Sequence, residues 1–193
     1  MAGYQVLNDQ TWQFGDYAIH SVRVDDSESI RKWRNEQMSA LRQSRTLTIE
    51  EQNCYFRDSV ITEFSSPNPR KILVRFTLKG LLIGYGGIVH IHWPDQRGEI
   101  SFLLETSRAN NSEIYVRELN VFLSLITKLA FNHLGLNKLS TESYNHRLNH
   151  VRAIEDFGFT REGILRKHTL INGKWVDSVV ASLLKDDFRD KLL

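Results

Sequence analysis

The middle of the chain constrains the fold most, because its hydrophobic pattern has the period of β-strands and two turn signals divide it. Lys79-Gly80 and Pro94–Gly98 are these signals, and they separate strands that we expect at 72–78, 81–93 and 99–105. The second of these strands is unusually rich in glycine. Because turns this short join neighbouring strands, the pattern predicts a three-stranded antiparallel meander.

Helical patterns come before this meander. An alternating stretch over 17–24 predicts a strand, and apolar residues at helical spacing over 28–41 predict a first helix. Thr48 and Glu51 form a capping box, which places the start of a second helix that runs to about Phe64.

After the meander the period changes again. Apolar residues recur at helical spacing over 119–133, and Gly135 follows where a left-handed cap is needed. The remaining expected elements are a strand at 139–144, a helix at 145–156, and a hairpin of strands 159–170 and 174–184 that turns at Asn172-Gly173. A strand–helix–strand unit between antiparallel strands predicts an α/β (α+β) fold with a mixed sheet and helices on both faces.

Length and composition narrow the class of protein. The chain has 193 residues, which predicts a single domain over 1–193. A net charge of +2 argues against bulk electrostatic binding of nucleic acid, and the single Cys54 excludes an internal disulfide and a multi-cysteine zinc site. The longest apolar stretch, within 114–134, is broken by charged residues, so we expect no membrane segment and a cytoplasmic location.

Four motifs follow one another over about 150 residues. The first is Trp-Arg-Asn within Ile30–Asn35, and the second and third are the stretches Ile83–Gly87 and Gly98–Leu104. The fourth lies within Glu155–Asp177, where Gly-Phe, Glu-Gly, Arg, Gly and Asp occur in this order. Together they resemble the GNAT superfamily of acyl-CoA-dependent N-acyltransferases, particularly its RimJ/RimL-type branch and the nucleotide-aminosugar N-acetyltransferases. The resemblance implies a twisted, mostly antiparallel seven-stranded sheet and acetyl-CoA or another acyl-CoA as co-substrate.

The resemblance also implies where acyl-CoA binds. In this family the fourth and fifth strands splay apart, and acyl-CoA lies in the gap. The backbone of Phe102, Leu103 and Leu104 would then hold the pantetheine and the thioester. The pyrophosphate would bind amides at the start of the long helix, where unpaired donors and the helix dipole favour anions.

The expected pyrophosphate loop, residues 105–117, departs from the family because it contains no glycine. One alternative is that its polar residues supply the left-handed backbone and the cap that glycine usually provides. The other is that the cradle is degraded and binds CoA weakly or not at all. The residues expected to take part are Arg108, Asn110, Asn111, Ser112 and Glu113.

A base must deprotonate the attacking amine, and the resemblance points to Glu99, with Glu142 as the second choice. Each carboxylate also has a structural alternative. Glu99 would then be an exposed strand residue beside Arg97, and Glu142 would form an ion pair with Arg147 or Arg152. The family's usual acid, a tyrosine, falls on Ile154, and its asparagine falls on Arg147. Tyr144 is a candidate replacement for the acid, with packing as its alternative role.

The acceptor amine is expected near Trp33, Arg34 and Asn35. His90 and His92, two residues apart on one face at the end of the glycine-rich strand, are also expected near it. The alternative for Trp33 is a place in the hydrophobic core, and the alternative for Arg34 is a place on a solvated face of the helix. Two histidines supply only half of a metal site, so no metal is predicted.

The sequence therefore predicts acetyl transfer to a small-molecule amine, with a nucleotide-linked amino sugar as the preferred acceptor. A protein N-terminal amine and a non-catalytic ligand-binding module are the alternatives, and a larger acyl donor is a third possibility. We predict no nucleic-acid or membrane partner. The oligomeric state stays open, with a homodimer through strand edges as one alternative.

Overall fold

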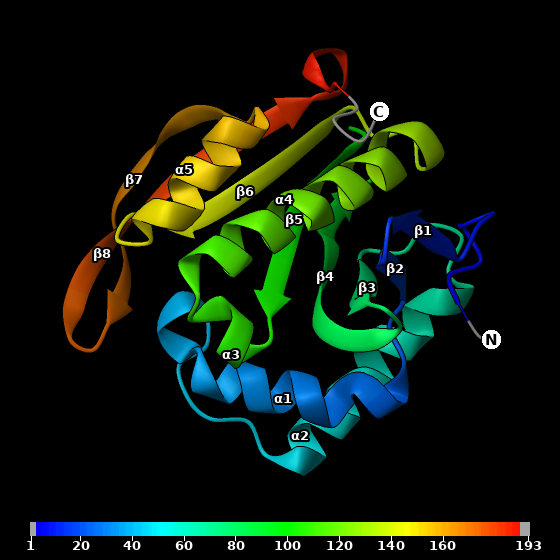
Figure 1. Cartoon of the computed structure of the whole chain (residues 1–193), viewed down its shortest axis with the longest axis horizontal. Coiled ribbons are helices and arrows are strands. Elements are labelled where there is room, and N and C mark those ends of the chain that lie inside the picture. Colours follow the sequence, from blue (N-terminus) through cyan, green and yellow to red (C-terminus); the bar gives the residue numbers. More distant parts are fainter. Residues whose placement is uncertain (1–2, 190–193) are drawn as a thin grey trace.

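The computed structural model describes residues 3–189 and contains one eight-stranded sheet with the strand order β1-β2-β3-β4-β5-β6-β8-β7 (Figure 1). All neighbouring strands are antiparallel except β5 and β6, which are parallel. The strands are β1 (Thr11–Phe14), β2 (Tyr17–Ser21), β3 (Ile72–Leu78), β4 (Leu81–His92), β5 (Arg97–Leu104), β6 (Lys138–Tyr144), β7 (Thr160–Ile171) and β8 (Lys174–Leu184).

The predicted count of seven strands is wrong by one, because β1 was not expected. This strand has four residues and pairs with β2 at the edge of the sheet. The segment Thr-Trp-Gln-Phe alternates polar and apolar residues, but it is only four residues long and only Trp12 is buried, so its strand signal is short. The mixed, mostly antiparallel sheet is confirmed.

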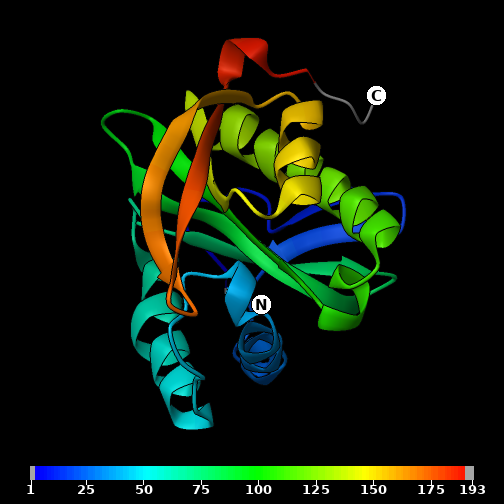
Figure 2. The same cartoon turned by 90° about the vertical axis from the view of Figure 1, so that its left-hand side faces the viewer.

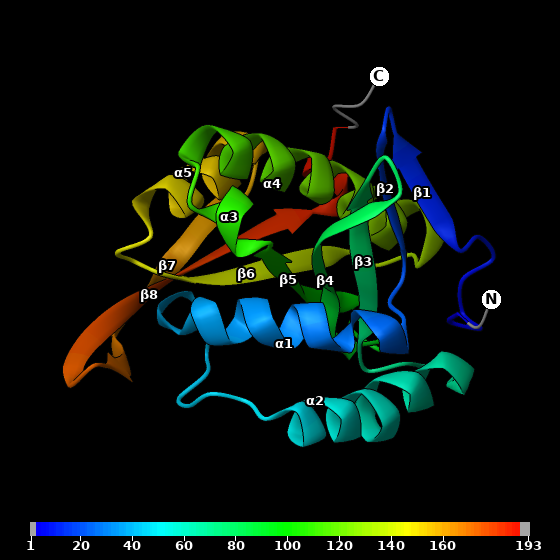
Figure 3. The same cartoon turned by 60° about the horizontal axis from the view of Figure 1, so that its bottom comes forward.

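Helices cover both faces of the sheet, as predicted. Figure 3 shows the first two helices on one face and the other three on the opposite face. They are α1 (Ser27–Glu36), α2 (Ile49–Tyr55), α3 (Thr106–Ala109), α4 (Ser112–Lys128) and α5 (Leu148–Phe157). No helix within residues 3–189 is long and apolar enough to cross a membrane.

The residues at the helix ends have the conformations and hydrogen bonds that their side chains predict. The Thr48 hydroxyl accepts from the Glu51 amide, and the Glu51 carboxylate accepts from the Thr48 amide at 2.9 Å, so the predicted capping box is confirmed. Beyond Tyr55 the helix continues as a π-helical turn and a 3₁₀ turn to Ser65. Gly135 adopts the predicted left-handed conformation, with a φ of 67°.

The glycines of β4 let three strands pack closely. Gly87 has a φ of 143°, and a Cβ there would lie 2.0 Å from the carbonyl oxygen of Ile72. A Cβ on Gly86 would lie 2.2 Å from the carbonyl oxygen of Ser101. The backbones of β3 and β5 therefore occupy the space that side chains on β4 would need.

The parallel pairing between β5 and β6 is short. Three residue pairs join the strands, from Arg97↔Lys138 to Glu99↔Ser140. Beyond them the strands separate, although β5 stays paired with β4 to Leu104 and β6 with β8 to Tyr144. The structure thus has the gap that the resemblance implied between these two strands.

Candidate active site

A cavity of about 360 Å³ lies where β5 and β6 separate, and we call it the splay cavity. Both strands, the connection after α1, and the inner faces of α4 and α5 line it. The lining residues that matter below are Arg34, Arg42, His90, Glu99, Phe102, Glu142, Tyr144, Arg147, His150 and Ile154. All three predicted catalytic residues, Glu99, Glu142 and Tyr144, are among them.

Glu99 and Glu142 come from the two separating strands, and Arg42 lies between them. The Arg42 guanidinium donates to the Glu99 carboxylate, and its Nη1 lies 3.8 Å from Glu142 Oε2. His168 Nε2 lies 3.5 Å from Glu142 Oε1. The expected alternative partners of Glu142, Arg147 and Arg152, do not pair with it within the described residues.

Tyr144 closes one side of the splay cavity. Its hydroxyl donates to the carbonyl oxygen of Leu41 at 3.2 Å. Burial raises the pKa of Tyr144, and the nearby Arg42 cation opposes this shift. The phenol is therefore protonated at neutral pH, with its proton directed toward the connection after α1.

A second cavity, of about 640 Å³, lies at the N-terminal ends of α4 and α5, and we call it the helix-end cavity. Asn110, Ser112 and Tyr115 line it from the α4 side. It shares Arg147 and His150 with the splay cavity, so these two residues lie where the two cavities meet.

The N-cap of α4 is confirmed, but the left-handed backbone is wrong. The Asn111 side chain accepts from the amides of Glu113 and Ile114 at 3.1 Å each. Asn111 has φ −98° and ψ 110°, and Asn110 is right-handed helical with a φ of −75°. The glycine-free loop avoids positive φ because it forms the short helix α3 before the cap.

Arg108 lies against a buried carboxylate. Its Nε donates to Glu118 Oε2 at 2.9 Å, and its Nη2 pairs with Oε1 of the same residue. Glu118 is fully buried and also accepts from the Tyr17 hydroxyl at 3.3 Å. The structure thus places this guanidinium against α4, whereas contact with a pyrophosphate stays a prediction.

Among the residues expected to hold the pantetheine, Phe102 lines the splay cavity. The side chains of Leu103 and Leu104 lie in the hydrophobic core. The Leu104 carbonyl accepts from the Gln37 side chain at 2.9 Å. These contacts fix the backbone at the end of β5, and its role toward pantetheine stays a prediction.

A third cavity, of about 800 Å³, lies on the other face of the sheet, beside α2 and its continuation. We call it the α2-side cavity. Arg34 and His90 line both this cavity and the splay cavity, and His92 lines the α2-side cavity alone.

Arg34 donates to the Tyr85 hydroxyl at 2.9 Å. His90 lies at a break in the β4–β5 register with a φ of 52°, and His92 Nδ1 lies 2.9 Å from Asp95.

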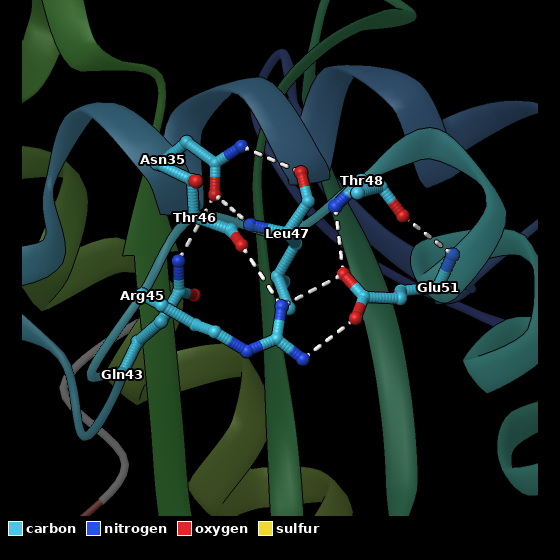
Figure 4. A network of polar contacts seen from close by, with 7 residues as sticks. All are labelled: Asn35, Gln43, Arg45, Thr46, Leu47, Thr48 and Glu51. Carbon is cyan, nitrogen blue, oxygen red and sulfur yellow. Dashed lines mark hydrogen bonds and ion pairs between the residues drawn. The ribbon is translucent and has the colours of Figure 1, made fainter.

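The other two predicted acceptor residues have internal partners. Trp33 belongs to the hydrophobic core, in agreement with its alternative role. The Asn35 side chain donates to the Leu47 carbonyl at 2.9 Å and accepts from its amide at 2.8 Å, while Gln43 donates to the same Asn35 oxygen (Figure 4). Asn35 therefore fixes the connection between α1 and α2, and neither residue lines the splay cavity.

Sequence reasoning missed the group around Tyr115 in the α4–α5 wall. Tyr115 Oη lies 2.8 Å from His150 Nδ1, and Arg147 Nη2 donates to the same hydroxyl at 2.8 Å. A signal was present, because His150 precedes Ile154 by one helical turn and therefore shares its face. Within residues 3–189 no cluster of three or more potential metal ligands exists.

Residues 19–180 match the family model described as "Acetyltransferase (GNAT) domain". The chain belongs to the GNAT acetyltransferase family. The probable N-acetyltransferase YjcK of Bacillus subtilis is 36% identical over 63 residues, which is 33% of this chain and 35% of that protein's own length.

Solved GNAT structures share the fold at low identity. The spermidine N-acetyltransferase of Vibrio cholerae, in complex with CoA and spermine, aligns with a TM-score of 0.78 at 15% identity, covering 89% of this chain and 97% of that one. The ribosomal-protein-S5-alanine acetyltransferase of Vibrio fischeri aligns with a TM-score of 0.72 at 20% identity, covering 94% of this chain and 100% of that one.

Proposed function

We propose that this GNAT protein transfers an acetyl group from acetyl-CoA to a primary amine by direct attack in a ternary complex. Membership of the family supports the reaction type. One observation carries the assignment of the site: Glu99 and Glu142 face the same cavity from the two strands that separate. A carboxylate at this point can remove the proton that an attacking amine must lose.

In the proposed reaction the amine nitrogen forms a bond to the thioester carbonyl carbon. The carbon–sulfur bond then breaks, and its electron pair leaves with sulfur. Glu99 accepts the proton from the amine, directly or through water, and Glu142 is the second candidate. The α4 N-terminus, which Asn111 caps, would bind the pyrophosphate through amides and the helix dipole.

For the acceptor we propose an amine that carries phosphate, such as a nucleotide-linked amino sugar. The α2-side cavity is lined by four Arg or Lys side chains (Arg34, Arg70, Lys71 and Arg97) and two carboxylates (Asp58 and Glu63). Guanidinium and ammonium groups bind phosphate well. A polyamine would meet an excess of like charge there. A protein N-terminal amine is the next candidate.

Two measurements test this function. A thermal shift with acetyl-CoA tests binding, and at 100 times the dissociation constant we expect about 2.7 kcal/mol of added stability. Release of the CoA thiol is then followed with a UDP-linked amino sugar, a peptide with an N-terminal alanine, and spermidine. We expect the highest kcat/KM for the UDP-linked sugar.

A matched pair of variants locates the acceptor. Lys71→Glu reverses a charge in the α2-side cavity, whereas Lys79→Glu reverses one in the β3–β4 turn, where Lys79 lies 3.7 Å from Asp16. We expect Lys71→Glu to raise KM for the UDP-linked sugar about tenfold and Lys79→Glu to change it little. Higher activity toward the peptide or spermidine would overturn the acceptor. No thermal shift with millimolar acetyl-CoA would favour a non-catalytic binding module.

A further inference from the structure

A hydrogen-bonded chain of three side chains lies between α4 and α5, and the reaction proposed above does not use it. Arg147 Nη2 is 2.8 Å from the Tyr115 hydroxyl oxygen, and that oxygen is 2.8 Å from His150 Nδ1. Tyr115 is buried in the first turn of α4. The chain ends at the His150 ring, which lines both the splay cavity and the helix-end cavity.

A guanidinium can only donate, so the Tyr115 oxygen accepts from Arg147. We assign the Tyr115 proton to the bond with His150, because within the described residues the hydroxyl has no other acceptor. His150 Nδ1 therefore accepts, and the neutral ring carries its hydrogen on Nε2. Burial, together with the Arg147 cation, lowers the pKa of His150 well below its ordinary value, so the ring is neutral at pH 7.

The position of the ring is as informative as its tautomer. Ile154, where the family's tyrosine acid is expected, lies one turn further along α5 and lines the same splay cavity. Within the described part of the chain, the bond with Tyr115 is the one hydrogen bond of the His150 ring. Its Nε2–H is thus left for a molecule in the cavities.

We propose that His150 is a catalytic residue that hydrogen-bonds the leaving sulfur through Nε2–H, and that Tyr115 and Arg147 are positioning residues that fix its tautomer. This role rests on the acetyl transfer proposed above. As the nitrogen–carbon bond forms, the carbon–sulfur electron pair moves to sulfur and Glu99 takes the amine proton. His150 keeps its own proton and stabilises the thiolate by the hydrogen bond alone.

The kinetic test compares His150→Leu, which has no donor, with His150→Gln, whose amide can donate from nearly the same place. We expect kcat at saturating acetyl-CoA to fall about 10²-fold in His150→Leu, the usual cost of removing one such donor, with KM for acetyl-CoA little changed. His150→Gln should recover part of the loss. His133→Gln, at an exposed position outside the cavities, should match the wild type.

A second readout is independent of turnover. Nitrogen-15 NMR of the His150 ring in the free protein should show hydrogen on Nε2, and Tyr115→Phe should mix the two tautomers and lower kcat. If His150→Leu fails to fold, Tyr115→Phe carries the kinetic test alone.

Hydrogen on Nδ1, or a folded His150→Leu variant with kcat within threefold of the wild type, would overturn the role of His150. A wild-type chain that binds acetyl-CoA but transfers nothing would defeat the proposed function and this catalytic role together, while the tautomer result would stand.

Discussion

Arg42 donates to Glu99 at the point where β5 leaves its parallel pairing with β6. The same guanidinium approaches Glu142 on the other strand, so one cation bridges the two strands of the gap. Arg42 is half-exposed, and it belongs to the connection between α1 and α2 rather than to the sheet. An ammonium group that approaches the same Glu99 oxygen competes with Arg42 for it.

Removing the charge of Glu99 tests its role as the base. We expect Glu99→Gln to lower kcat by about 10²–10⁴-fold, because the amide cannot accept the amine proton. The dissociation constant for acetyl-CoA, measured by calorimetry, should stay near the wild-type value. Glu50→Gln, on the exposed first turn of α2, is the control. A nearly unchanged kcat would transfer the role to Glu142 or to water.

Two substitutions at Asn111 separate folding from donor binding. Asn111→Ala removes the α4 cap and should destabilise the protein by about 1 kcal/mol. Asn111→Asp keeps a capping oxygen but adds negative charge where we place the pyrophosphate, so its thermal midpoint should hold while acetyl-CoA affinity falls several-fold. Equal acetyl-CoA affinity in Asn111→Asp and the wild type would place the pyrophosphate elsewhere.

Gly87 is predicted to be intolerant of any side chain. Alanine there would combine a φ of 143° with a Cβ 2.0 Å from the Ile72 carbonyl oxygen. We expect Gly87→Ala to lower the free energy of unfolding by about 3 kcal/mol or more, measured by urea titration. Gly163→Ala has no atom within 4 Å of its new Cβ and should stay close to the wild type.

Stability should fall on acidification because two histidines resist protonation in the folded state. Burial lowers the pKa of His20 and, more strongly, of His150 from the ordinary value of 6.5. Below pH 6.5 these histidines bind protons in the unfolded chain but not in the folded chain. The free energy of unfolding therefore falls as the pH is lowered from 6.5.

Thermal midpoints between pH 7.5 and 5 measure this linkage. The slope should be shallower in His150→Gln than in the wild type. An identical slope in His150→Gln would mean that His150 titrates normally in the folded protein.

Most elements could be predicted from the sequence because their signals are local. The hairpin at Asn172-Gly173 and the capping box at Thr48 both depend on residues a few positions apart, and both formed as expected. The edge strand β1 escaped prediction because an alternating pattern of only four residues is too short to indicate a strand without its pairing with β2.

The candidate site was predictable only in part, because its chemistry depends on contacts between distant segments. Glu99 and Glu142 were expected to face one gap and do so. Nothing in the sequence shows that Arg42 reaches across to both, or that Arg108 is held by Glu118, ten residues away. The Trp-Arg-Asn motif does not act as a set: Trp33 lies in the core, Asn35 fixes the connection between α1 and α2, and of the three only Arg34 lines the splay cavity.

The short pairing of β5 with β6 gives the sheet a seam. Strands β1–β5 form one half of the sheet, and β6 with the β7–β8 hairpin, orange and red in Figure 2, forms the other. Three residue pairs between β5 and β6 join the two halves. Heat should open the molecule first along this line, because so little backbone pairing crosses it. A molecule bound in the gap would contact both halves of the sheet. We therefore expect the thermal stability of the protein to increase with the occupancy of this site.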